Sequence, residues 1–240
     1  EMLIQERDGS ILTVTLNLPE KRNPISDMDL IDALCAAMEA ADRDISVRCV
    51  ILTGAGPSFS SGGDLKQMKP DAGPLRSSKT YETRRNYKFG IQRLPLMFQA
   101  LEVPVVAAVN GHAIGAGLDL ATMCDVRVAG ESAKFAESFV KLGIIPGDGG
   151  AWLLPRVIGF SRATELALTG EMIDAAEALK IGLVSHVVPD AELMAKAREV
   201  AGKIAANPPH AVRMAKRLLR EAQTADLKNI LEMSAAMQAL

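Results

Sequence analysis

The sequence predicts an α/β protein, with helices packed on a parallel sheet and a region of helices alone after it. Two short apolar runs, residues 49–53 and 103–109, show no polar alternation, and a glycine-rich segment follows each of them. Such runs are typical of strands that are covered on both faces. Strand, glycine loop and helix in alternation indicate a parallel sheet. From Ser161 onward the patterns are helical only.

The first elements are a hairpin and a helix. Residues 2–6 and 11–16 are rich in strand-forming residues and flank the turn Asp8-Gly9, which predicts a β-hairpin. A helix is predicted from Ser26, which we expect to cap it, with Asp29 three residues on. Apolar side chains then recur at helical spacing, at Ile31, Leu34, Cys35 and Met38.

Two further strands are predicted at residues 126–129 and around Phe135. Residues 66–88 are polar and basic and contain glycine and proline, so we expect a mobile segment beside the site.

The C-terminal part is predicted to be helical. Ser161 and Asp174 are expected caps, and Gly170 and Gly182 are expected helix ends. Amphipathic helices follow over residues 190–206, over residues 210–222 and from about Asp226. The basic helix from His210 to Arg220 is interpreted as a solvated or intersubunit face. Its successor is still helical in pattern at residue 240, which predicts a further C-terminal segment.

Composition narrows the class of protein. The 240 residues are 48% hydrophobic and 23% charged, which excludes a disordered tail. The net charge of −2 gives no basic excess for nucleic acid or an anionic membrane. The three cysteines form no CxxC pair, which argues against a disulfide framework or zinc cluster and favours a reducing compartment. With no long apolar run and no basic leader, we expect a cytoplasmic protein without a metal.

Two glycine segments, residues 60–65 and 110–119, each follow a predicted buried strand. Ligands bind at the carboxyl ends of parallel strands, and glycine lets them approach the backbone closely. One N–H group from each loop, aimed at a single oxygen, would form an oxyanion hole. A dinucleotide loop requires GxGxxG, whereas the order here is GxxxGxG, and the GK[ST] of a P-loop is absent. Glycines that only permit close packing remain the alternative.

Three linked motifs carry a family resemblance. They are FSSGGDL (59–65), AAVNGHAIGAGLDLATMCDVRVAG (107–130) and FAESFVKLGIIPGDGG (135–150), followed downstream by LPRVIG and LTGEMIDAAEALKIGLVSHVVP. From about residue 3 to 235 the chain resembles the enoyl-CoA hydratase/isomerase (crotonase) superfamily. The resemblance implies a crotonase-like spiral of ββα units over residues 1–188, with the acyl-CoA site, and a C-terminal helical trimerisation region over 189–240. It also implies a homotrimer or dimer of trimers, fatty acid metabolism, and no cofactor beyond the coenzyme A of the substrate.

The resemblance also assigns the binding groups. It places the oxyanion-hole N–H groups on Ser61 and Ala116. It places contacts to substrate and coenzyme A at Arg22, Pro24, Ser60, Gly62, Gly63, Asp64, Leu65, Gly115 and Phe139.

The acid–base residues depart from the family pattern. The two glutamates of family hydratases fall on Asp119 and Phe139, and a phenyl ring carries no transferable proton. Asp148 is the first candidate for a second carboxylate, although the family's isomerases and its dehalogenase place their acid one position earlier, at Gly147. Helix capping, or a turn ahead of Gly149-Gly150, is the alternative role for Asp148. Glu137 is a further candidate.

The resemblance thus implies an enoyl-CoA hydratase/isomerase that stabilises an enolate with a non-standard acid–base set. One alternative is a double-bond isomerase that uses Asp119 and Asp148. Another is an acyl-CoA-binding protein without catalysis, which Phe139 supports.

Overall fold

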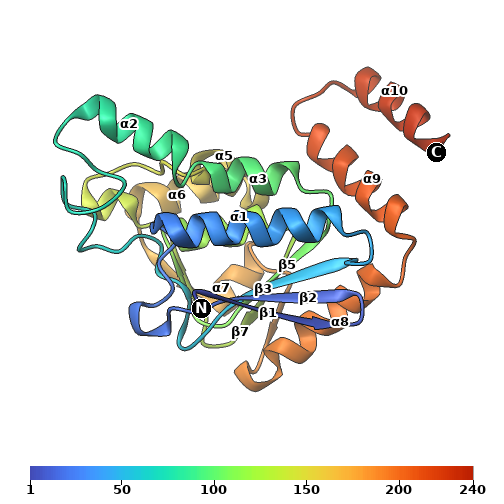
Figure 1. Cartoon of the computed structure of the whole chain (residues 1–240), viewed down its shortest axis with the longest axis horizontal. Helices are drawn as coiled ribbons and strands as arrows, with labels where there is room; N and C mark the ends of the chain where they lie inside the picture. Colours follow the sequence, from blue (N-terminus) through green and yellow to red (C-terminus); the bar gives the residue numbers. More distant parts are fainter. Residues whose placement is uncertain (240) are drawn as a thin grey trace.

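The computed structural model describes residues 1–239, and within them two β-sheets are surrounded by helices (Figure 1). The larger sheet has six strands in the order β1-β2-β3-β5-β7-β10. Their bounds are β1 (Leu3–Asp8), β2 (Ile11–Leu16), β3 (Cys49–Gly54), β5 (Val105–Val109), β7 (Val126–Gly130) and β10 (His186–Val188). The hairpin prediction is confirmed, since β1 pairs antiparallel with β2 and the other neighbours pair in parallel.

The two central strands are buried on both faces, as their apolar runs predict. Successive residues of a strand point to opposite faces. On β3, Cys49 and Ile51 pack in a cluster with α8 (Leu193–Ala205), whereas Val50 and Leu52 pack in the main core. The main core includes α1 (Met28–Arg43) and α3 (Arg93–Ala100), so the sheet is covered by helices on both sides (Figure 1).

A second sheet of four strands lies within the described residues, in the order β4-β6-β8-β9. These strands are β4 (Ser58–Ser60), β6 (His112–Ile114), β8 (Lys134–Ala136) and β9 (Met172–Asp174). Each of β3, β5 and β7 is followed by a short strand of the second sheet and then by helices, which confirms the spiral of ββα units. Of these short strands only β8 was predicted, because three residues are too few to show a period of two.

The first helices differ from the prediction in two details. Helix α1 is capped by Asp27, whose carboxylate accepts the N–H groups of Asp29 and Leu30. The predicted cap, Ser26, is wrong, because its hydroxyl accepts the N–H of Asp64 instead. The segment 66–88, predicted to be mobile, contains most of helix α2 (Thr80–Phe89).

The middle helices surround the second sheet. They are α4 (Ala116–Met123), α5 (Gly150–Ile158), α6 (Phe160–Thr169) and α7 (Ala175–Lys180), and the 3₁₀ helices are η1 (Pro19–Lys21), η2 (Phe139–Leu142) and η3 (Asp190–Glu192). Asp174 caps α7 through the N–H of Glu177, as predicted. Gly170, with φ of +60°, ends α6 as predicted, but Ser161 is not its cap because the helix begins at Phe160.

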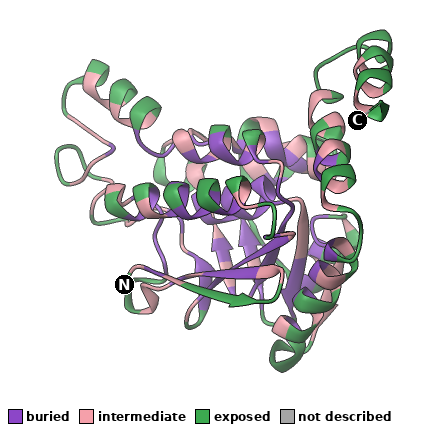
Figure 2. Cartoon of the chain, turned by 45° about the vertical axis from the view of Figure 1, so that its right-hand side comes forward, coloured by how far each residue is buried: buried purple, intermediate pink, exposed green. Residues whose placement is uncertain are grey.

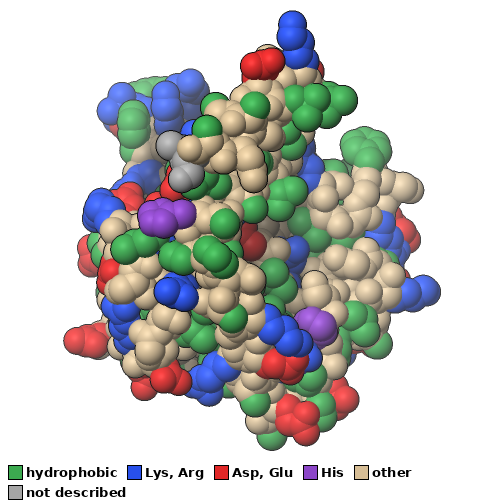
Figure 3. Space-filling view, turned by 90° about the vertical axis from the view of Figure 1, so that its right-hand side faces the viewer, with side chains coloured by type: hydrophobic (Ala, Val, Ile, Leu, Met, Phe, Trp, Pro, Cys, Tyr) green, Lys and Arg blue, Asp and Glu red, His purple; other side chains and the backbone are tan. Residues whose placement is uncertain are grey.

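The C-terminal helices α9 (Pro209–Glu221) and α10 (Leu227–Gln238) lie at the opposite end of the molecule from α2, and α10 extends away from the sheets (Figure 1). Helix α10 contributes no buried residue (Figure 2). Leu219, Leu227 and Leu231 are exposed, and apolar side chains are visible on this side of the molecule (Figure 3). A trimer contact at these helices remains a prediction. No helix within residues 1–239 has the length and apolar character needed to cross a membrane.

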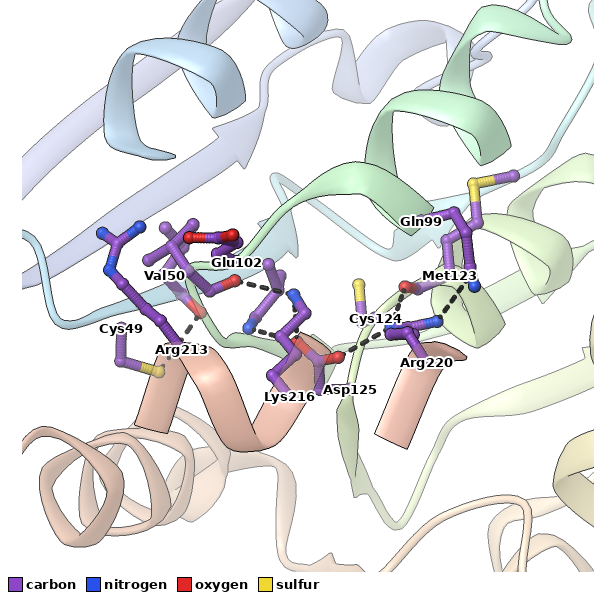
Figure 4. Close-up of polar contacts among 12 residues, drawn as sticks. Cys49, Val50, Gln99, Glu102, Met123, Cys124, Asp125, Arg213, Lys216 and Arg220 are labelled. Carbon is purple, nitrogen blue, oxygen red and sulfur yellow. Dashed lines mark hydrogen bonds and ion pairs between the residues drawn. The ribbon is translucent and has the colours of Figure 1, made fainter. Parts of the chain in front are cut away.

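The basic face of α9 is buried against the core, so its interpretation as a solvated or intersubunit face is wrong (Figure 4). Lys216 Nζ lies 2.8 Å from Asp125 Oδ2 and donates to the carbonyl oxygen of Val103 at 2.7 Å. Arg220 Nη2 lies 2.6 Å from Asp125 Oδ1. Arg213 pairs with Asp42 at 3.1 Å. These contacts attach α9 to the larger sheet and to α1.

Candidate active site

The two glycine loops meet at the start of α4. Gly62 has a φ of +80°, and a Cβ atom at this position would lie 2.9 Å from the backbone nitrogen of Ala116. A side chain would therefore collide with the first turn of α4 as well as strain the backbone. The loop after β4 and the loop after β6 thus converge, which the oxyanion hypothesis requires.

One of the two predicted donors is already occupied. The N–H group of Ser61 donates to the carbonyl oxygen of Arg22 at 2.8 Å. Pro24 and Gly62 form a parallel β-bridge, which lays the chain at Arg22 alongside Ser61. The assignment of the Ser61 N–H to an oxyanion hole is therefore wrong in this structure, because a hydrogen bond within the protein already uses that donor.

The N–H groups of Gly63 and Ala116, beside the contact of the two loops, have no acceptor within residues 1–239. Ala116 is the first residue of α4, where backbone N–H groups have no partner inside the helix. The helix dipole also places partial positive charge there. Gly63 directly follows the contact between Gly62 and α4. The two free N–H groups thus come from the two loops that meet where Gly62 contacts the first turn of α4.

Asn23, which sequence reasoning missed, holds this loop in place. It is fully buried with a φ of +52°, a conformation that asparagine tolerates better than most residues. Its amide nitrogen donates to the carbonyl oxygens of Ala55 and Ser58, and its amide oxygen accepts the N–H of Leu18. The Asn23-Pro24 pair is itself a turn signal that could have identified the residue.

The buried hydroxyl of Ser60 belongs to the same arrangement. It donates to the carbonyl oxygen of Asn23 at 2.7 Å and accepts the N–H of Gly62 at 3.1 Å. Asp64 accepts the N–H of Lys66 and so stabilises its own turn. Both predicted contact residues therefore serve the shape of the loop in this structure.

The other predicted contacts differ in exposure. Arg22 and Leu65 are exposed at the surface. Gly115 is buried with a φ of +54°, and a Cβ atom there would lie 3.6 Å from the ring of Phe139. The phenyl ring of Phe139 therefore lies beside the first turn of α4, next to the free donor of Ala116.

Three carboxyl groups gather on the other side of α4, and we call them the carboxyl cluster. They are Asp119 of α4, Glu137 after β8 and Asp148 before α5, with exposures of 0%, 1% and 2%. A Cβ atom on Gly150 would lie 2.7 Å from Asp119 Oδ2, and closer still to Asp119 Oδ1 and Glu137 Oε1. The structure thus brings together all three carboxylates proposed from the sequence, and Gly150 provides the space.

None of the six carboxyl oxygens of this cluster accepts a hydrogen bond from any described residue. The capping alternative for Asp148 is wrong, because α5 begins after Gly149 without a side-chain cap. Within residues 1–239 no group of His, Cys, Asp and Glu side chains is arranged to hold a metal ion. Buried carboxyl groups without donors are costly to ionise, so structural stability does not explain their presence.

Burial raises the pKa of all three groups. For Asp119, burial acts first and the negative charges of Asp148 and Glu137 raise the pKa further. Burial raises the pKa of Glu137 to about 8, and it also raises the pKa of Asp148. The carboxyl cluster therefore retains protons near neutral pH and can hold a base and an acid side by side.

This proton retention predicts a pH-dependent stability. The unfolded chain releases the proton of Glu137 near its ordinary pKa of 4.5, whereas the folded protein holds it to about pH 8. Between these values the folded state binds more protons, so the free energy of unfolding should fall with rising pH, by up to about 1.4 kcal/mol per pH unit for one group. Urea denaturation across this window should show the decline, and Glu137→Gln should make it shallower. An equally steep decline in Glu137→Gln would contradict the assignment.

Comparisons with known proteins identify the family and the fold. A family model described as enoyl-CoA hydratase/isomerase matches residues 6–239. The short-chain-enoyl-CoA hydratase of Clostridium acetobutylicum is 39% identical over 232 residues, 95% of this chain and 85% of that protein. The 1,2-epoxyphenylacetyl-CoA isomerase of Escherichia coli is 36% identical over 240 residues, 100% of this chain and 90% of its own length. A crystal structure of enoyl-CoA hydratase from Bacillus anthracis has a TM-score of 0.91 at 36% identity, with 100% of this chain and 90% of that chain covered.

Proposed function

The chain belongs to the enoyl-CoA hydratase/isomerase family, and on that premise we propose that it moves a double bond in an enoyl-CoA thioester. Family membership makes it an enzyme of the hydratase/isomerase type that acts on an acyl-CoA, in preference to a binding protein without catalysis. The observation that carries the finer proposal is the carboxyl cluster of Asp119, Glu137 and Asp148, which is buried and free of hydrogen-bond donors. Its member Asp119 lies on α4, the helix that begins with the free N–H of Ala116.

The thioester carbonyl oxygen is proposed to bind between the N–H groups of Gly63 and Ala116. Both donors are free within the described chain, and the start of α4 adds partial positive charge. Removal of a proton from the substrate places negative charge on this oxygen, where two fixed donors stabilise it most effectively. Gly63 therefore replaces Ser61 in the proposed oxyanion hole.

Asp119 is proposed as the base. Its carboxylate takes a proton from the α-carbon of a 3-enoyl-CoA, and the electron pair spreads over the dienolate to the thioester oxygen. The proton then returns to the γ-carbon, so the double bond moves from position 3 to position 2. Glu137 and Asp148, whose pKa values are raised by burial, keep further protons next to Asp119.

Isomerisation is favoured because Phe139 occupies the place of the second glutamate of family hydratases, with its ring beside Gly115. An apolar ring gives a water molecule no anchor. Hydration is the second candidate, because Glu137 lies against Asp119 and offers another carboxyl group. The relatives differ in the same way, since one is named a hydratase and another an isomerase.

The test is turnover of 2-enoyl-, 3-enoyl- and dienoyl-CoA esters in deuterated buffer. We expect bond migration in the 3-enoyl ester, with deuterium incorporated at the α- or γ-carbon. A 3-hydroxyacyl-CoA formed from the 2-enoyl ester, without migration of the 3-enoyl ester, would favour hydration. The absence of bond migration, deuterium exchange and water addition with all of these esters would contradict both candidates.

The remaining expectations are part of the proposal. A proton shift needs no cofactor beyond the coenzyme A of the substrate. Pro24 forms the β-bridge to Gly62 and Arg22 lies two residues before it, and both remain the proposed contacts for coenzyme A. A homotrimer or a dimer of trimers, formed through the C-terminal helices, is the proposed assembly.

A further inference from the structure

An open cavity of about 620 Å³ lies between α2 and the loop that leads to Asp148. We call it the cationic cavity. Its lining residues are Arg76, Thr80, Thr83, Arg84, Tyr87, Lys88, Gln92, Gly143, Ile144, Ile145 and Gly147. None of the residues expected to contact coenzyme A lines it, and no Asp or Glu does. The carboxyl cluster and the proposed oxyanion hole do not require this cavity, so it needs a separate explanation.

Three cationic residues line this cavity, and no carboxylate of residues 1–239 pairs with them. Within the described chain, Arg76, Arg84 and Lys88 form no ion pair with a carboxylate. The neighbouring Lys79 does form one, with Glu82 at 3.2 Å. Cations that share a concave surface repel one another and attract an anion. Guanidinium groups in particular bind carboxylates through paired hydrogen bonds.

The cationic cavity adjoins the carboxyl cluster. A Cβ atom on Gly147 would lie 2.8 Å from the ring of Tyr87, and Gln92 donates to the carbonyl oxygen of Gly147 at 2.8 Å. Asp148 is the next residue of that loop. Burial raises the pKa of Tyr87, the charge of Asp148 raises it further, and the charge of Arg76 lowers it. Tyr87 and Gly147 thus lie where the cationic cavity comes next to the loop that carries Asp148.

We infer that the acyl chain of the substrate ends in a second carboxylate, which Arg76, Arg84 and Lys88 bind in the cationic cavity. The substrate class is then the mono-CoA thioester of an unsaturated dicarboxylic acid. This inference rests on the proposed function, because it assumes that the reacting carbons lie at the carboxyl cluster. The phosphates of coenzyme A are the other anions available. They lie on the far side of the thioester from the acyl chain, whereas the cavity is built on the loop that carries Asp148.

The test compares 3-enoyl-CoA esters matched in chain length, one ending in a carboxylate and the other in a methyl group. For the full-length protein we expect a higher kcat/KM for the carboxylate-ended ester, by about tenfold or more. Arg84→Gln should reduce this preference by about tenfold. Arg85→Gln is the matched control, because Arg85 lies next to Arg84 on α2 but does not line the cavity. It should leave the preference as it is.

Equal kcat/KM values for the two esters in the wild-type protein would overturn the inference. It would also fail if Arg84→Gln weakened both esters and free coenzyme A alike, since the cavity would then bind a phosphate of coenzyme A. If neither ester were turned over, the proposed function would fail instead. Calorimetric binding of the two esters to the wild type and to Arg84→Gln would then still decide whether the cavity recognises the carboxylate.

Discussion

Asp119→Asn is expected to lower kcat by about a thousandfold while KM changes little. Asparagine has nearly the same shape as aspartate but cannot accept the substrate proton, and a positioned acid or base contributes about 10²- to 10⁴-fold. The variant should also fold well. It removes a buried carboxyl group whose ionisation is opposed by burial and by two neighbouring charges, so its unfolding free energy near pH 8 should equal or exceed that of the wild type.

Variants of the other two residues of the carboxyl cluster provide a comparison for the loss of kcat in Asp119→Asn. Glu137→Gln and Asp148→Asn should each cost less, about 10- to 100-fold, because they alter the protons near Asp119 and leave the base itself in place. Steady-state kinetics of the bond-migration reaction, together with urea denaturation, separates lost chemistry from lost folding. If Glu137→Gln lost activity and Asp119→Asn kept it, Glu137 would be the base.

Asp125→Asn is expected to destabilise the protein by about 3 kcal/mol. The carboxylate of Asp125 pairs with both Lys216 and Arg220, whose side chains are 8% and 13% exposed (Figure 4). Removal of one partner from a buried ion pair leaves an uncompensated charge, which typically costs about 3–5 kcal/mol. The loss should weaken the attachment of α9 to the core and appear as a lower midpoint of urea denaturation.

Glu102→Gln is the matched control for Asp125→Asn, because it breaks an ion pair that involves the same helix. Glu102 lies 3.6 Å from Arg217, and both side chains are nearly half exposed. Exposed pairs contribute about 0–1 kcal/mol, so this variant should remain close to wild type. Equal losses in the two variants would show that the Asp125 interactions do not hold α9.

Much of the fold was predictable because the relevant signals are local. The apolar runs of β3 and β5 and the Asp8-Gly9 turn each lie within a few residues, and all three are confirmed. The three-residue strands of the second sheet were missed except at Phe135, since they depend on pairing with distant strands. The expected cap at Ser26 was wrong for a similar reason. Its hydroxyl is taken by Asp64, a residue far along the chain.

The active site was likewise only partly predictable from the sequence. The sequence identified Asp119, Asp148 and Glu137 as candidate acid–base residues, but it did not decide whether Asp148 or Glu137 is the second carboxylate. Only the folded chain brings them into one buried cluster, with Gly150 providing the room. The donor from Ser61 was wrong because the partner of a backbone N–H depends on which strand lies beside it, and here that neighbour is Arg22.

The sequence by itself determined the family, the α/β fold class, and the chemical types of the groups available for catalysis. These properties follow from residue identity and spacing along the chain. The tertiary structure decided which N–H groups remain free, which carboxyl groups share protons and which cations of α9 are buried. Each of these depends on atoms that are distant in sequence and close in space, and on the loss of water around them, which no local pattern of residues records.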